Sequence, residues 1–316
     1  MGNPVLGIGT DVLFKIEALP GVREVLTSGA MHIDLISESL DYDPVLSNYP
    51  AIAGNRQKWS TAEFVSHNNG GGAITLRPRS AQMETILEIA LGKAATTTWV
   101  PIVDDSVDLP KFTVEATKAG QTALALVGCK VNTATFKSSV NEPLEVELDI
   151  LASSGVRNSS NTAWVSTQVD AETPFMHGGL VMSGAEAWLD DSLSAGNVEV
   201  RSIEFTLNNN LDAEAYCNST DRRLIPLGLF TLEGSMEIPY NATTKGFWAE
   251  RIAAVKVKFT ATWTDANANT LSAAFVVKLD GELPKISGPE EQWLKLNFHG
   301  VVDLVDPYCI IMSSVE

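Results

Sequence analysis

Residues 127–152 read VGCKVNTATFKSSVNEPLEVELDILA, two runs of alternating side chains joined by an Asn-bearing turn. Alternation of apolar and polar residues over roughly four to eight positions is typical of a half-buried β-strand. A second strand-turn-strand pattern lies at 198–240, VEVRSIEFTLNNNLDAEAYCNSTDRRLIPLGLFTLEGSMEIPY. Two copies are too few for a solenoid, in which each repeat packs only on its neighbours. They predict one mainly β, antiparallel domain built from duplicated hairpins.

The returning strand of each pattern places carboxylates on one face. Glu145, Glu147 and Asp149 alternate with apolar residues in LEVELDI, and Glu233 and Glu237 do so in TLEGSMEI. Antiparallel strands commonly have one face on the core and the other in water. The simplest interpretation is a solvated outer face. A hydrolase-type carboxylate pair is the alternative, but no neighbouring motif supplies a pocket for it.

One segment, SAQMETILEIALG at 80–92, has the spacing of an amphipathic helix. Ser80 is a candidate N-cap, and Gly92 is a stop signal. We therefore expect one flanking α-helix at about 80–91, with 247–255 as a candidate for a second.

Two segments carry loop and turn signals. Residues 41–60, DYDPVLSNYPAIAGNRQKWS, contain two prolines and a Gly-Asn pair and predict a long loop. Long loops in compact domains commonly have a function. NNGGG at 68–72 predicts a hairpin turn between two strands.

The pattern divides the chain into an arm and a domain. Residues 1–30 mix Gly, Pro and apolar residues without a period, which predicts an N-terminal arm with short extended pieces. Residues 31–316 are expected to form a single domain of two hairpin-containing halves, 31–152 and 164–316. A Ser/Asn-rich segment at 153–163 joins the halves.

Composition limits the function classes. The chain has 316 residues, 45% of them hydrophobic and 19% charged, which is ordinary globular composition. Its net charge of −17 argues against a nucleic-acid binder, because phosphate contacts need Lys and Arg. An acidic surface would instead repel DNA and let it slide. We expect no membrane anchor, since no apolar run approaches about 20 residues.

Signals for chemistry are sparse. The four histidines and three cysteines stand outside the spacings that bind metals or build active sites. Seven scattered tryptophans do not form a run that would stack on sugars. We therefore expect no enzyme activity, no cofactor and no metal.

The order of elements resembles the major tail tube proteins of long-tailed, siphovirus-like bacteriophages. The resemblance rests on arrangement and covers roughly 30–310. The segments that carry it are ISESLDYDPVLSNYPAIAGNRQ, ITLRPRSAQMETILEIALG, CKVNTATFKSSVNEPLEVELDILAS, IEFTLNNNL with IPLGLFTLEGSMEIPY, and FVVKLDGELPKISGPEEQWLKLNFHGVVD. An insertion at 212–223 separates the strands of the second hairpin.

The resemblance implies a β-sandwich or barrel-like subunit with one flanking helix. Six copies form a ring, the rings stack into a hollow tube, and the formal ring charge is 6 × (−17) = −102. The 41–60 loop would reach the next ring, and its expected contact residues are Asp41, Tyr42, Asp43, Tyr49, Arg56 and Trp59. The acidic strand faces would line the lumen, with Glu145, Glu147, Asp149, Glu233 and Glu237.

The expected function is structural. The chain would be a tail tube subunit in the virion, assembled in the host cytoplasm, that delivers double-stranded DNA without binding it specifically. Its partners would be copies of itself, a tape-measure protein and other tail proteins. The length of the chain favours a flexible tail over a contractile one. The alternatives are a tail terminator, a baseplate hub piece or a decoration protein, and, from another class, a carbohydrate-binding β-sandwich.

Overall fold

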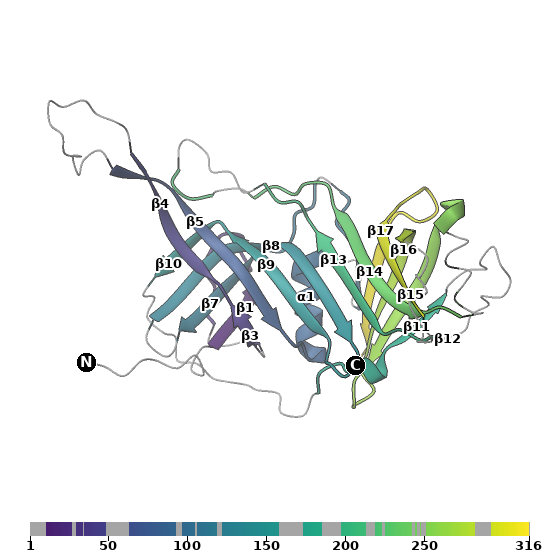
Figure 1. Cartoon of the computed structure of the whole chain (residues 1–316). Coiled ribbons are helices and arrows are strands. Elements are labelled where there is room, and N and C mark those ends of the chain that lie inside the picture. Colours follow the sequence, from purple (N-terminus) through teal and green to yellow (C-terminus); the bar gives the residue numbers. More distant parts are fainter. Residues whose placement is uncertain are drawn as a thin grey trace, which may run out of the picture.

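The fold is mainly β and antiparallel, as the alternation predicts, with one long helix beside the sheets (Figure 1). It is a computed structural model. The described residues are 11–26, 30–33, 35–48, 63–92, 97–104, 106–118, 122–157, 173–184, 197–212, 219–222, 225–241, 244, 247, 251–281 and 292–315.

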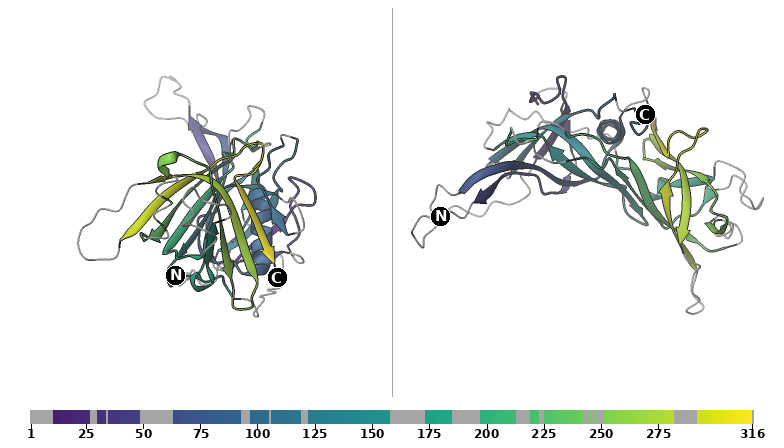
Figure 2. Two further views of the ribbon diagram at one scale, coloured as in Figure 1. Left: turned by 90° about the vertical axis from the view of Figure 1, so that its right-hand side faces the viewer. Right: turned by 90° about the horizontal axis from the view of Figure 1, so that it is seen from above.

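One long sheet runs through the chain and gives the molecule an arched outline, concave on the side away from the helix (Figure 2). Neighbouring strands pair antiparallel throughout, and the short strand β3 (Leu35–Glu38) precedes β4 along the same edge of β5. The order is β4 (Asp41–Asn48), β5 (Glu63–Leu76), β9 (Glu145–Ala152), β8 (Thr122–Ser139), β13 (Ser202–Asn208), β14 (Thr231–Pro239), β17 (Trp293–Gly300) and β16 (Thr270–Gly281).

Further strands cover the convex side of the arch. At one end they are β1 (Asp11–Ile16), β2 (Met31–His32), β7 (Phe112–Lys118) and β10 (Ser154–Arg157), which pair with one another or with β8. At the other end they are β11 (Val181–Gly184), β12 (Asn197–Val198), β15 (Val257–Thr264), β18 (Ile310–Val315) and β6 (Thr98–Trp99).

The N-terminal segment contributes to this covering layer. β1 lies inside residues 1–30, the predicted arm, and pairs with β7 along six residue pairs. Val12 and Phe14 are fully buried, and the Phe14 ring meets Phe112 edge-on at 5.5 Å between centroids. A short 3₁₀ turn, η3 (His177–Gly179), precedes β11.

The helix α1 (Ser80–Leu91) forms where the spacing predicts it and ends at Gly92, whose N–H donates to Glu88. Its start differs from the prediction: Arg79 is the N-cap, and its N–H donates to the Gln82 side chain at 3.0 Å. Ser80 is buried one position inside the helix. The buried face consists of Ser80, Met83, Ile86, Leu87, Ile89, Ala90 and Leu91.

Two predicted irregular segments are strands. The expected loop at 41–60 begins as β4, and the expected turn NNGGG at 68–72 lies inside the uninterrupted β5. The turn prediction at 68–72 was wrong, and the loop prediction was wrong for 41–48, because long-range pairing overrides the local signal of proline and glycine; residues 49–60 lie outside the described residues. Pro44 is tolerated because β4 has a strand on only one side among the described residues.

Gly71 shows why glycine occupies the middle of β5. Its φ is +147°, and an added Cβ would overlap the carbonyl oxygen of Ile150 on the neighbouring strand. We expect Gly71→Ala to lower the free energy of unfolding by about 1–3 kcal/mol, measured as a lower urea midpoint. Gly178→Ala is the matched control, because an added Cβ there has no atom within 4 Å. Equal midpoints for the two variants would contradict this account.

The pairings repeat within the chain. A first unit (β1, β2, β3–β4, β5, β7, β8, β9, β10) and a second unit (β11, β12, β13, β14, β15, β16, β17, β18) have the same partners in the same chain order. Residues 251–253 are helical, and they follow β14 as α1 follows β5.

This repeat corrects the sequence-based one. Residues 127–152 and 198–240 do form antiparallel hairpins, β8–β9 and β13–β14. They are not copies of each other, however. The counterpart of β8–β9 is β16–β17, and the counterpart of β13–β14 is the hairpin of β3–β4 with β5. Alternation alone does not distinguish these hairpins, because every half-buried hairpin shows it.

The two units meet where β8 pairs with β13 over seven residue pairs. Phe205 of β13 is the centre of this junction. Its ring stacks on Phe136 of β8 at 4.8 Å and meets Phe275 edge-on at 5.0 Å and Trp263 at 6.4 Å. Phe136 of the first unit is therefore joined to the aromatic cluster of the second unit through Phe205.

Candidate functional site

The concave face of the arch carries continuous rows of polar side chains. Residues directly opposite each other on paired strands lie on the same face of a sheet. One row crosses seven strands: Thr75, Glu147, Thr135, Thr206, Glu233, His299 and Lys278. A second row crosses six: Glu145, Lys137, Glu204, Ser235, Asn297 and Asp280.

The structure brings all five predicted acidic residues onto this face. Asp149 is opposite Thr133 in a third row, and Glu237 is opposite Lys295 in a fourth. The residues between them along each strand, such as Val146 and Leu148, are buried. The outward carboxylates therefore include those of Glu145, Glu147, Asp149, Glu233 and Glu237, together with Glu204 and Asp280, for which the sequence pattern had given no signal.

Basic side chains on the same face neutralise part of this charge. Lys137 Nζ lies 3.1 Å from a Glu147 carboxylate oxygen, and Arg201 lies 3.5 Å from Glu237. The hydrogen bond to Glu147, with the charges of Glu204 and Glu145, raises the pKa of Lys137. The face is thus acidic with interspersed cations, and not uniformly negative.

A two-stranded arm, residues 43–48 and 63–69, extends beyond the rest of the sheet (Figure 1). In this part β5 pairs only with β4 among the described residues, since its pairing with β9 ends at Gly70. Apolar side chains on the arm are exposed: Leu46 is 62% exposed and Phe64 51%. Leu46 is opposite Val65 and Phe64 is opposite Ser47, so apolar side chains are exposed on both faces of the arm.

The predicted inter-ring residues divide between the base of the arm and the part outside the description. Asp41 and Asp43 both pair with Arg157 of β10, and Tyr42 Oη donates to Asp221 at 2.7 Å. Burial and the Asp221 carboxylate raise the pKa of Tyr42 to about 12. The other three predicted residues, Tyr49, Arg56 and Trp59, lie outside the described residues.

Part of the 212–223 insertion docks on the base of this arm. The Arg222 guanidinium donates to Gly70 O at 3.2 Å and to the Asn69 side chain at 2.7 Å. Asn68 donates to the Asp221 carboxylate from its side chain, at 2.6 Å. The second unit therefore braces the first at the NNGGG run, a contact that no sequence signal could indicate.

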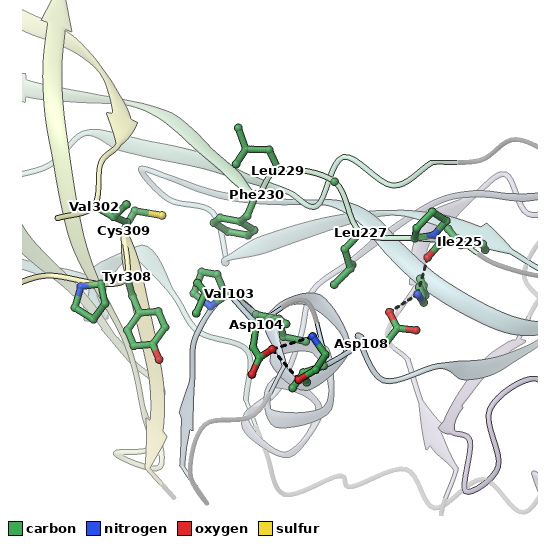
Figure 3. Close-up of a pocket in the computed structure, with 18 of the residues that line it drawn as sticks. Val103, Asp104, Asp108, Ile225, Leu227, Leu229, Phe230, Val302, Tyr308 and Cys309 are labelled. Atoms are coloured by element: carbon green, nitrogen blue, oxygen red, sulfur yellow. Dashed lines mark hydrogen bonds and ion pairs between the residues drawn. The ribbon is translucent and has the colours of Figure 1, made fainter. Parts of the chain in front are cut away.

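A cavity of about 720 Å³ lies on the helix side between the two units (Figure 3). Its lining is largely apolar, with Val103, Phe230 and Tyr308 around it. Lys130 is buried there, ion-paired with Asp108 and donating to Ile225 O at 2.6 Å. Burial lowers the pKa of Lys130, against the opposing effect of Asp108. Lys130 therefore joins β8 to the segments that carry Asp108 and Ile225, which is a structural role.

The described residues hold neither a candidate metal site nor a candidate membrane span. They include no group of three or more His, Cys, Asp or Glu side chains arranged to hold a metal ion. None of their helices is long and apolar enough to cross a membrane. Cys129 and Cys309 are buried thiols, and burial raises the pKa of both.

A curved antiparallel sheet with a polar concave face, a projecting arm and, among the described residues, unpaired edges at β4 and the end of β16 is typical of a structural β-protein. The chain belongs to the phage tail tube protein family, whose sequence model matches residues 7–299. Comparison with curated proteins finds no match. Membership confirms the resemblance: the chain is a structural component of a phage tail tube, in the tail of the virion, and the family favours a non-enzymatic role.

Proposed function

We propose that this chain builds rings that stack into a hollow tube, and that DNA passes along its concave face during delivery into the host. The observation that carries the proposal is the set of polar rows across the arch, with carboxylates at Glu145, Glu147, Asp149, Glu204 and Glu233. A face that curves around a passage presents these groups to whatever moves through it.

The charge pattern suits transit. Adhesion to DNA requires several Lys or Arg contacts with phosphates. Here Lys137 and Arg201 already contact carboxylates on the same face, Lys278 and Lys295 lie in the same rows as further carboxylates, and the chain as a whole carries −17. DNA would meet a hydrated, weakly repulsive wall, so it slides without specific binding.

The arm is the proposed contact between rings. Leu46 and Phe64 are exposed on it in a single chain, and burial against a neighbouring ring would remove this apolar area from water. Residues 49–62 connect its two strands and would take part in the same contact. The proposed contact between rings would include the residues that the sequence pattern assigns to it: Asp41, Tyr42, Asp43, Tyr49, Arg56 and Trp59.

The wider assembly follows the family. The resemblance implies rings of six copies, for chains that carry one unit each. This chain carries two units, and the ring would again contain six units in total. A tape-measure protein would occupy the passage before DNA does, and other tail proteins would close the ends of a flexible tail. Assembly would take place in the host cytoplasm.

A charge exchange on the concave face tests the lumen. We expect tubes of Glu145→Lys with Glu233→Lys to retain double-stranded DNA at about 50 mM salt and to release it at about 200 mM, as phosphate contacts do. Unmodified tubes should retain none. The measurement is co-sedimentation of labelled DNA with tubes, with imaging of the same samples.

The control variant carries the same charge change on the helix side, Glu84→Lys with Asp104→Lys, and should not retain DNA inside tubes. Equal retention by both variants would place the five carboxylates outside the passage. Single rings that never stack, at any concentration, would favour a tail terminator or hub piece over a tube subunit.

A further inference from the structure

The strand pairing that joins the two units within one chain gives a geometric model for pairing between two chains. β8 of the first unit pairs with β13 of the second. In the repeat, β16 is the counterpart of β8, and the β3–β4 ribbon is the counterpart of β13. The edge that β8 offers to β13 therefore has an equivalent on β16, and the edge that β13 offers has one on β4.

Both equivalent edges are open in the described residues. β4 pairs there only with β5, and β16 beyond Val277 pairs only with β17. An open edge presents unpaired N–H and C=O groups and is a template for another strand. The two edges lie at opposite ends of the arch (Figure 2).

We propose that β4 of one copy pairs antiparallel with the end of β16 in the next copy, and that three copies close one ring. This inference rests on the proposed tube function and specifies it. Each ring then contains six tube units from three chains. A head-to-tail contact of this kind closes into a ring when its rotation allows.

The register of the contact follows from the repeat. Asp149 is the fifth residue of β9, and Asn297 is the fifth residue of its counterpart β17. Thr133 is opposite Asp149 and Asp280 is opposite Asn297, so Thr133 and Asp280 correspond. On the next strands, Ala73 of β5 is opposite Asp149 and Ser235 of β14 is opposite Asn297, so Ala73 and Ser235 correspond. Four residues earlier on these strands, Asn69 is opposite Asp43 and Thr231 is opposite Asn208, so Asp43 and Asn208 correspond.

In the junction, Asn208 is opposite Thr133. The contact between copies therefore places Asp43 opposite Asp280 of the next copy, both on the concave face. Pro44 corresponds to Asn209, whose N–H donates to Asn132 O at 2.8 Å in the junction. Because proline has no N–H, the pairing ends before the arm, which stays free to project.

Arginines on each side offset part of the charge at this contact. Asp43 pairs with Arg157, which also pairs with Asp41, and Asp280 lies 3.2 Å from Arg251. The contact would thus bring together three acids and two bases. Like charges directly opposite on paired strands destabilise a sheet when they are alone.

Barrel geometry selects the number of copies. Strands about 4.8 Å apart and tilted by about 40° each occupy about 6 Å of circumference. Eight strand positions per chain then give backbone diameters of about 32, 48 and 95 Å for two, three and six copies. A DNA duplex is about 20 Å wide, and side chains occupy about 5 Å on each wall. The duplex would fill the barrel of two copies, pass freely through the barrel of three copies and leave the barrel of six copies largely empty.

Disulfide trapping tests the contact and the count together. The variant is Asp43→Cys with Asp280→Cys in a Cys217→Ser background, assembled into tubes and oxidised. We expect a denaturing, non-reducing gel to show a ladder that ends at three chains, 3 × 34.0 = 102 kDa. The matched control, Asp43→Cys with Asn297→Cys, moves one cysteine a strand further away and should not cross-link.

The outcomes separate the inference from the proposed function. A ladder that reaches six chains in normal tubes overturns the count of three, and tubes without any cross-link overturn the β4–β16 contact. Threefold symmetry in images of the tubes supports the count. Absence of tubes from the unmodified protein and from both variants contradicts the proposed function itself, and the inference falls with it.

Discussion

Phe205→Ala should lower the free energy of unfolding by about 3–5 kcal/mol, the cost of deleting a fully buried phenylalanine. Phe205 is 1% exposed and contacts Phe136 of the first unit and Phe275 of the second. Its removal leaves a cavity at the point where the units meet. Urea unfolding should show a lower midpoint with an unchanged slope.

The control is Leu229→Ala, since Leu229 is 81% exposed and its truncation should change the midpoint little. A second observation tests the junction itself. If the two units unfold separately in Phe205→Ala, the transition should split into two phases, whereas one cooperative transition means that the β8–β13 pairing still couples them. A midpoint equal to that of Leu229→Ala would contradict the central role of Phe205.

Leu46→Ser with Phe64→Ser should abolish long tubes while leaving the fold intact. Both side chains are largely exposed on the arm, so the single chain loses little by the change. Contact between rings would lose two apolar anchors, and such anchors carry most of the energy of an interface. Electron microscopy should show rings or short stacks where the unmodified protein forms tubes.

Two further results complete this test. Leu229→Ser with Val302→Ser is the matched control, because these residues are 81% and 60% exposed but line the cavity on the helix side, away from the arm. Tubes of normal length from this control, together with equal urea midpoints for all proteins, would assign the effect to stacking. Normal tubes from the arm variant would show that the arm does not join rings.

The fold class and the helix were predictable because they depend on local periodicity. Glu145 and its alternating neighbours form β9 with every second residue buried, and α1 spans Ser80–Leu91 as its spacing indicates. The shared face of the five carboxylates was predictable for the same reason. Which side of the assembled wall that face occupies depends on other copies of the chain, so it remains a proposal.

What failed depended on distant contacts. NNGGG carries a turn signal, yet Gly71 lies in mid-strand because the Ile150 carbonyl leaves no room for a side chain. The docking of Arg222 on Asn69 joins residues 153 positions apart, which no local pattern encodes. The repeat of two units was visible only from the strand pairings, since the sequences of its strands share alternation and little else.

The β8–β13 junction lies within one polypeptide, so the two units are always synthesised together and always adjacent. Evolution can therefore alter one unit without altering the other. The first carries the projecting hairpin, whereas the corresponding connection of the second folds back onto its neighbour. In a ring of the proposed kind, the projecting hairpin of the first unit and the folded-back connection of the second therefore alternate around the circumference. A protein that binds the outside of the ring would meet the same surface at every second unit.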